Sequence, residues 1–336
     1  MQPSHWLKLI ILTIIGLILL FISLSTIKLE DFLITLQKLK VEMVIISIIF
    51  FLTFYLIRGV RWAILLRPVK NSVSLINTFR ITIIGYFVNT LIPIRIGEFV
   101  RAIILNRKER IGIFEGLSSI AVERILDLFS ISLIGFITIL FLPSNITYPS
   151  WFIDGLTLIF TFALIAIVGV IIATIMQIKF LSFAERLLNK LSIISNKWRE
   201  KIFNSLKSIL EGASGLGQEF SLVTLSFVLS LLIWMVYALS FYFIFEAFAC
   251  KLHWSIIILG TTLMAASFIF PAAPGFLGTF EAAWMVIFLF GFKLPAEILM
   301  PIGFFTHLIN VLVAVIPGYL CVMWIGIKGK ELFQSK

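Results

Sequence analysis

Charged side chains are scarce in this sequence: Asp, Glu, Lys and Arg together make up 13% of the 336 residues. A soluble domain carries about a quarter charged residues, so this scarcity excludes an ordinary soluble protein. Hydrophobic residues reach 60% and the mean hydropathy is +1.11. The composition therefore predicts an all-α polytopic membrane protein, because a helix satisfies its own backbone hydrogen bonds inside the bilayer.

Cysteine and histidine are also rare, with two cysteines and three histidines in the chain. Cys250 and Cys321 are expected toward opposite faces of the membrane, which excludes a disulfide between them. The histidines are far apart and lack metal-ligand spacing. The sequence also has no P-loop, nucleophile elbow or dinucleotide-binding motif. We therefore expect no metal, no cofactor and no catalytic residue set, and so not an enzyme.

The net charge of +10 comes from basic residues that gather in a few stretches, namely 58–80, 95–110, 179–207 and the C-terminus. Such clustering is typical of cytoplasmic segments under the positive-inside rule. We expect contact with anionic lipids and no nucleic-acid partner. All basic stretches face the cytoplasm together if both termini are cytoplasmic, in a multi-pass protein of the cell (inner, cytoplasmic) membrane.

Six apolar runs approach the ~20 residues that a membrane-spanning helix needs. They are Leu9–Ile27, Met43–Ile57, Ile125–Leu142, Ile153–Met176, Leu222–Ala249 and Ile298–Ile325. The second run is short, and Arg58, Arg61 and Trp62 after it are interpreted as an anchor at the membrane interface.

Two further apolar segments are interrupted by helix-breaking residues. Leu75–Leu105 is broken at Pro93 and Gly97, and Ser255–Phe290 is broken between Pro271 and Gly278. Each is expected to form a re-entrant hairpin or a pair of thin spans, the first entered from the cytoplasm and the second from outside. Matched interruptions in two halves are typical of transporters with inverted repeats.

We therefore predict one integral membrane domain over residues 1–336, with inverted repeats at 43–142 and 222–325. Residues 179–217 carry apolar side chains at helical spacing opposite a charged face. This pattern predicts amphipathic cytoplasmic helices on the inner leaflet. A linker packed against the cytoplasmic ends of the spans is the alternative interpretation.

The first break contains candidate binding residues. They are Asn89, Pro93, Arg95, Gly97, Glu98 and Arg101. Arginine next to a helix N-terminus favours phosphate, so Arg95 and Arg101 are expected to contact a phosphate-bearing lipid head group. The alternative is a loop anchor with a local ion pair. Asn89 has an equal claim to a structural role, in which it satisfies backbone groups freed by the break.

Three charged residues, Glu123, Arg124 and Asp127, come just before the third predicted span. Glu123 and Asp127 are four residues apart and share a helix face, where like charges repel unless a cation lies near. The candidate cations are Arg124, an arginine of the first break and a cationic substrate. A structural carboxylate–arginine network is the alternative to direct substrate contact.

The second break supplies further candidates, namely Pro274, Gly275, Gly278 and Glu281. A carboxylate at that depth must be paired or protonated. Glu281 is expected to carry a proton, bind a cationic head group or pair with an arginine of the first break. His307, with Asn310, is interpreted as an interhelical hydrogen-bonding group rather than a proton relay.

Two further motifs accompany the two breaks: Val122-Glu123-Arg124-Ile125-Leu126-Asp127 lies between them, and Arg58-Gly59-Val60-Arg61-Trp62 lies upstream. Together, these motifs resemble the membrane domain of lysylphosphatidylglycerol synthases. The resemblance covers nearly the whole chain. It implies a lipid flippase module, like those standalone relatives that lack the cytosolic aminoacyltransferase domain.

We therefore expect a flippase for a phosphate-bearing lipid, either aminoacylated or isoprenoid-linked. In it, Glu98, Glu123, Asp127 and Glu281 hold the arginines or a cationic head group. The partners are membrane lipids, with a homo-oligomer and a separate lipid-modifying enzyme left open. An integral-membrane transferase acting on a polyprenyl-phosphate lipid and a small-solute transporter remain alternatives.

Overall fold

The structure, a computed structural model, describes residues 3–25, 36–37, 39–92, 96–176, 181–183, 185–187, 199, 203, 207, 220–268 and 272–325. The described part of the chain is helical and contains no strand, which confirms the predicted fold class. The first half contains α1 (Pro3–Ser25), α3 (Val41–Leu66), α4 (Leu75–Leu91), α5 (Gly97–Glu109), α6 (Ile113–Ile139) and α7 (Trp151–Ile175). The second contains α10 (Phe220–Ala247), α11 (Trp254–Ser267), the 3-10 turn η1 (Pro274–Phe276), α12 (Thr279–Trp284), the π-helix η2 (Met285–Gly291) and α13 (Ala296–Ile325).

Each of the six predicted spans coincides with a helix, namely α1, α3, α6, α7, α10 and α13. Among the described residues, four stretches are long and apolar enough to cross a bilayer: Val41–Leu66, Trp151–Gly169, Ser221–Ala247 and Ala296–Ile325. Helix α6 is of similar length but carries four charged residues in its first half. The protein is therefore a multi-pass membrane protein with a charged layer inside one of its long helices.

The prediction that Arg58, Arg61 and Trp62 form an anchor at the membrane interface is wrong. The second span does not stop at Ile57, because α3 continues to Leu66. Arg58, Arg61 and Trp62 lie inside this helix and are 1%, 0% and 0% exposed. They are buried because they meet partners on α5 and α6 within the protein.

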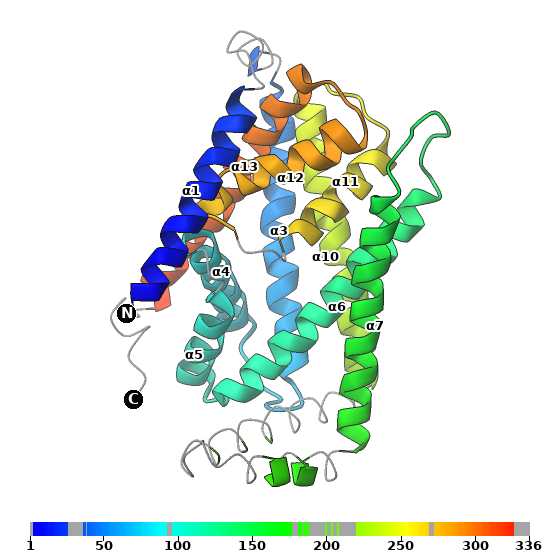
Figure 1. Cartoon of the computed structure of the whole chain (residues 1–336). Helices are drawn as coiled ribbons and strands as arrows, with labels where there is room; N and C mark the ends of the chain where they lie inside the picture. Colours follow the sequence, from blue (N-terminus) through cyan, green and yellow to red (C-terminus); the bar gives the residue numbers. More distant parts are fainter. Residues whose placement is uncertain are drawn as a thin grey trace.

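Both breaks occur where the sequence predicts them. Helix α4 ends at Leu91 and α5 begins at Gly97, while α11 ends at Ser267 and α12 begins at Thr279. In Figure 1 the first pair lies in the lower part of the bundle and the second in the upper part. Pro93, Arg95, Pro271 and nearly all of the 179–217 segment lie outside the described residues.

Helices α3 and α10 form the centre of the bundle and pack along their length. Ser47 donates a hydrogen bond to the Ser240 carbonyl at 2.7 Å, and the Phe50 and Phe243 rings stack at 5.2 Å. Around this pair, α4 packs against α13 and α11 packs against α6. Each interrupted segment therefore contacts a long helix of the other half.

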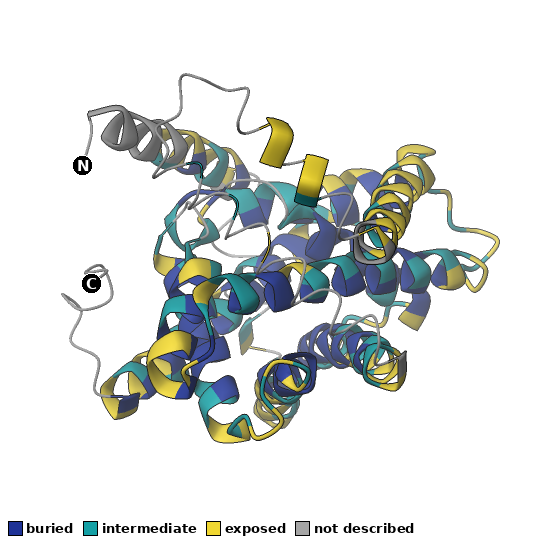
Figure 2. Ribbon diagram, turned by 90° about the horizontal axis from the view of Figure 1, so that it is seen from below, coloured by how far each residue is buried: buried dark blue, intermediate teal, exposed yellow. Residues whose placement is uncertain are grey.

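The outward faces are apolar, as a lipid-facing surface requires. On α7, Leu158, Phe162 and Ile165 are among the most exposed side chains. Figure 2 shows the exposed positions on the outer faces of the helices and the buried positions between them. The start of α1 and the end of α13 lie at the same end of the bundle (Figure 1), where Lys108 of α5 donates to the Ile325 carbonyl at 3.0 Å.

Candidate functional site

Glu123 and Asp127 lie on one face of α6, as their spacing predicts, and are 0% and 3% exposed. The face points toward α3, α5 and α10. Two carboxylates four residues apart on a helix repel each other, and burial weakens solvent screening. The pair is therefore stable only when several cations surround it.

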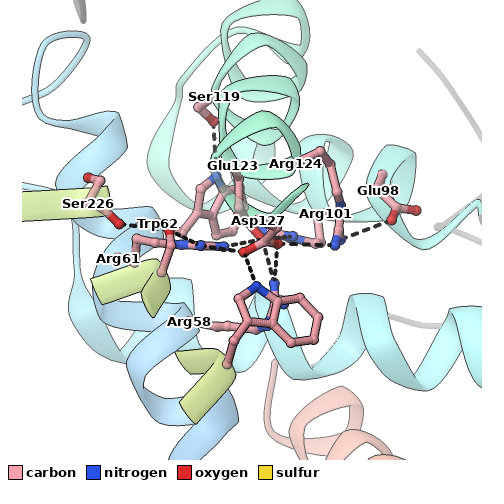
Figure 3. Close-up of polar contacts among 12 residues, drawn as sticks. Arg58, Arg61, Trp62, Glu98, Arg101, Ser119, Glu123, Arg124, Asp127 and Ser226 are labelled. Atoms are coloured by element: carbon pink, nitrogen blue, oxygen red, sulfur yellow. Dashed lines mark hydrogen bonds and ion pairs between the residues drawn. The ribbon is translucent and has the colours of Figure 1, made fainter. Parts of the chain in front are cut away.

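Four arginines provide those cations (Figure 3). Arg58 Nη1 of α3 lies 3.2 Å from Glu123 Oε1 and 3.0 Å from Asp127 Oδ2. Arg61 contacts the same two carboxylates at 3.2 and 2.6 Å. Arg101 of α5 forms a bidentate pair with Glu123, at 2.8 and 3.3 Å. The sequence suggested Arg124 and an arginine of the first break as cations for this pair. The structure adds two arginines of α3 to them.

The network extends into the second half through α10. Trp234 Nε1 donates to Asp127 Oδ1 at 3.2 Å, and Arg61 donates to the Ser230 hydroxyl at 2.6 Å. The guanidinium of Arg58 lies 4.6 Å from the Phe54 ring centre and 5.1 Å from that of Trp234. Cation–π contacts of this kind stabilise a desolvated arginine.

Glu98 and Arg101 do not form the local ion pair considered above. Each turns to α6 instead: Glu98 Oε1 lies 3.1 Å from Arg124 Nη2, and Arg101 pairs with Glu123. Arg101 also stacks over the Trp62 ring at 4.1 Å and is 1% exposed. Glu98 and Arg101 therefore have separate partners, and the guanidinium of Arg101 is already engaged by Glu123 and Trp62.

Asn89 holds the first break together. Its side-chain oxygen accepts a hydrogen bond from the Gly97 N–H at 2.7 Å, and its Nδ2 donates to Glu98 Oε2 at 3.2 Å. The start of α5 is thereby fixed against α4. Helix α4 comes so close at Gly85 and Asn89 that Gly97 has no room for a side chain.

Gly97→Ala is expected to destabilise the protein by about 1–3 kcal/mol, the usual cost of overpacking. The added methyl group would overlap the Gly85 carbonyl oxygen and the Asn89 side chain. Thermal unfolding in detergent measures the effect. Gly169→Ala on α7 is the matched control, since nothing lies within 4 Å of a methyl group there. Equal melting temperatures for the two variants would contradict the close approach.

A cavity of about 170 Å³, measured as the volume open to the centre of a water molecule, lies beside the network. This volume is enough for several water molecules or a phosphate-sized group. Its charged lining consists of Arg58, Glu98, Arg124 and Asp127. Its aromatic lining consists of Phe54, Tyr55, Tyr86, Trp234, Tyr237, Phe268, Phe276 and Phe280. Both halves of the chain therefore contribute to one cavity.

Several hydrogen-bond donors at the cavity have no acceptor among the described residues. The Nε atoms of Arg58 and Arg124, two arginines that line the cavity, lack such an acceptor, but these two atoms are buried away from water. The hydroxyl groups of Tyr55, Tyr86 and Tyr237 also make no hydrogen bond within the described part of the chain. The Tyr55 and Tyr86 rings are 5.0 Å apart, and Tyr237 lies 5.0 Å from Phe54. The tyrosine hydroxyls are therefore the unused donors that remain accessible at the cavity.

The second half contributes His307 and Asn310 of α13 to the cavity lining. His307 Nδ1 lies 2.6 Å from Glu281 Oε1, and His307 Nε2 lies 2.7 Å from the Gly275 carbonyl oxygen. Glu281 Oε2 accepts from the Gly278 N–H at 2.8 Å. Glu281 is therefore paired with His307 and not with a described arginine of the first break. His307 joins α13 to α12 and η1, as an interhelical hydrogen-bonding group does.

The glycines of the second break have backbone conformations that few other residues adopt. Gly275 has φ +65° and Gly278 has φ +74°, and Pro274 begins the intervening 3-10 turn. The backbone of Gly278 is also in close contact with Gly16 of α1. These residues shape the turn that Glu281 and His307 hold.

Metal chemistry has no evident site in the described part of the chain, where no group of three or more potential His, Cys, Asp or Glu ligands occurs. Cys250 and Cys321 are both free, in agreement with the prediction.

Sequence reasoning missed Arg58, Arg61, Trp234 and the tyrosines as members of the site. A signal was present for the first two. They are three residues apart, on one face of an otherwise apolar helix, and charge inside such a helix usually marks a functional position. The tyrosines carried no comparable signal, because aromatic residues are common throughout this chain.

Comparison with known proteins shows the family to which this chain belongs. The model of the lysylphosphatidylglycerol synthase TM region matches residues 6–318. A UPF0104 membrane protein of Methanothermobacter thermautotrophicus is 26% identical over 250 residues, 69% of this chain and 68% of the relative. A UPF0104 membrane protein of Methanocaldococcus jannaschii is 29% identical over 170 residues, 48% of this chain and 49% of the relative. No solved structure matches. Since the family model covers most of the sequence, the chain belongs to the lysylphosphatidylglycerol synthase transmembrane-region family.

Proposed function

We propose that this protein moves a lipid with a phosphate-bearing head group between the leaflets of the membrane. The observation that carries the proposal is the cavity between the two halves. It combines the charged side chains of Arg58 and Arg124 and the unused hydroxyls of three tyrosines with aromatic walls. Such donors suit a phosphate, and aromatic walls suit the apolar part of a lipid.

The charge balance supports an anionic cargo. Four arginines (58, 61, 101 and 124) face three carboxylates (98, 123 and 127), which leaves one excess positive charge in the network. Arg124 has the most exposed side chain of the four, at 34%. It replaces Arg101 as our candidate for phosphate contact among the described residues, since Arg101 is fully engaged by Glu123 and Trp62.

The packing of the helices supports the inverted repeat on which this proposal draws. Exchanging α3 with α10, α4 and α5 with α11 and α12, and α6 with α13 converts the principal contacts among these eight helices into one another. The α4–α13 contact becomes α11–α6, and α3–α4 becomes α10–α11. A transporter of this form binds its cargo between the repeats, where the cavity lies.

The orientation we propose has both termini in the cytoplasm of a cell-membrane protein. Two features support it: basic residues cluster around α5, and the end of α13 lies at that same end of the bundle. The cavity then receives the head group while the acyl or isoprenoid chains stay in the bilayer.

Leaflet exchange of fluorescent lipids in proteoliposomes tests the proposal. The panel should contain phosphatidylglycerol, lysyl-phosphatidylglycerol, phosphatidylcholine and a polyprenyl phosphate. We expect exchange that depends on the head group and exceeds that of protein-free vesicles. Well-folded protein that moves none of these lipids would overturn the proposal. Saturable uptake of a water-soluble solute instead would favour a small-solute transporter.

Simultaneous Tyr55→Phe, Tyr86→Phe and Tyr237→Phe substitution is expected to slow exchange of the anionic lipids by at least about tenfold, since a hydrogen bond to a charged group contributes roughly 1.5–3 kcal/mol. The aromatic rings stay, so the cavity keeps its shape. The same vesicle assay measures the rate. Tyr319→Phe on the exposed face of α13 is the control. An unchanged rate in the triple variant would remove the tyrosines from the binding site.

A further inference from the structure

The His307–Glu281 pair has a hydrogen-bonding pattern that fixes its proton content. The Gly275 carbonyl oxygen can only accept, so His307 Nε2, 2.7 Å away, carries a hydrogen. His307 Nδ1 and Glu281 Oε1 are 2.6 Å apart, a separation that requires one more proton between them. The pair is therefore either imidazolium with carboxylate or imidazole with carboxylic acid, and both forms are neutral overall.

Loss of that proton is incompatible with the observed contacts. The Nδ1 lone pair would then face a carboxylate lone pair at hydrogen-bonding distance, in a site where Glu281 is 2% exposed. The repulsion is relieved when the imidazole turns away from Gly275 or the carboxylate leaves the Gly278 N–H. Either movement frees the 274–278 turn. Phe276 of this turn lines the cavity, so proton occupancy and cavity shape are linked.

The surroundings isolate the pair from other proton sites. The described side chains of α1, and all of α11 and η2, contain no titratable group. From α3, α4, α5, α6 and α10, the titratable and charged groups that line the same cavity are Arg58, Glu98, Arg124, Asp127 and the three tyrosines. The two carboxylates among them hold arginines. His307 also lines the cavity, so a proton exchanges with cavity water there.

We propose that His307 and Glu281 bind the proton of a proton-coupled transporter, and that release of this one proton to cavity water unlatches the 274–278 turn. The proposal deepens the function proposed above and rests on it for the lipid cargo. The proton-dependent latch stands on the contacts of the pair and is tested separately.

Glu281→Gln is the decisive variant because a glutamine amide reproduces the protonated pair. Its oxygen accepts from Gly278 N–H and its NH₂ donates to His307 Nδ1, yet it has no proton to release. We expect this variant to fold and to stay latched at every pH. Glu297→Gln, at an exposed position in the first turn of α13, is the control.

The latch is measured first, without any lipid cargo. Amide hydrogen exchange of residues 272–282 is followed in detergent across a pH series and corrected for the intrinsic exchange rate. Wild type and Glu297→Gln should lose protection as pH rises, by up to about tenfold per pH unit for a single proton. Glu281→Gln should stay protected throughout. Protection that is independent of pH in wild type would overturn the proton site.

The coupling is measured second, in vesicles that contain labelled phosphatidylglycerol and a trapped pH dye. A proton gradient should change the exchange rate according to its direction, with proton movement that Glu281→Gln abolishes. Lipid exchange that ignores the gradient would overturn the coupling and leave the flippase proposal intact. Absence of lipid exchange together with a pH-dependent turn would instead overturn the flippase proposal and retain the proton site.

Discussion

Glu123→Ala is expected to lower the free energy of unfolding by about 3–5 kcal/mol, the cost of removing one partner from a buried ion pair. Glu123 is fully buried and contacts Arg58, Arg61 and Arg101. Without it, Arg101 has no carboxylate partner among the described residues, and the remaining charges in the interior repel. Membrane proteins tolerate an ionisable group at such a position only when it is paired.

The melting temperature and the yield of monodisperse protein in detergent measure this effect. Asp154→Asn removes a carboxylate from the exposed first turn of α7 and should match wild type. Glu123→Gln should fall between the two, since it keeps a hydrogen-bond acceptor but no charge. A Glu123→Ala protein as stable as the Asp154→Asn control would show that the arginines do not depend on this carboxylate.

Arg124→Ala is expected to leave the protein folded and to slow transport of a phosphate-bearing lipid by about tenfold to a hundredfold, the value of one charge-assisted hydrogen bond. Its partners do not lose their other contacts. Asp127 keeps Arg58, Arg61 and Trp234, and Glu98 keeps Asn89. The loss therefore falls on the contact that Arg124, a residue of the cavity lining, makes with the cargo.

Leaflet exchange in proteoliposomes measures the rate, and the melting temperature checks the fold. Arg124→Lys should recover only part of the activity, because an ammonium group lacks the planar fork that matches phosphate. Arg67→Ala, at an exposed position just after α3, is the matched control. Wild-type exchange by Arg124→Ala would exclude this arginine from cargo binding, and an unfolded Arg124→Ala protein would assign it to the structural network.

The sequence predicted the helical architecture well because bilayer thickness leaves few choices for a long apolar run. Each predicted span coincides with a helix, and helices end and begin on either side of both predicted breaks. The error was at Ile57, where the charged residues that follow were interpreted as the end of the membrane-spanning helix. Helix α3 continues through Arg58 and Arg61, because carboxylates distant in the sequence are available inside the bundle.

The sequence predicted some members of the site, but not the pairings between them. Spacing placed Glu123 and Asp127 on one face, and the need for a cation beside them followed. Which cation meets which carboxylate depends on how α3, α5 and α6 cross, and local sequence does not contain that information. The same reason explains why Glu98 and Arg101, adjacent on α5, have partners on α6 instead of each other.

The contacts between the halves also bear on the order of events during synthesis. The arginines and carboxylates of the network all belong to α3, α5 and α6, so these charges can neutralise one another before the ribosome has made the second half. The apolar flanks of α3 and α4, by contrast, wait for α10 and α13. A chain halted between α7 and α10 would therefore have its charges paired inside the membrane while its largest helix-packing surfaces still faced lipid.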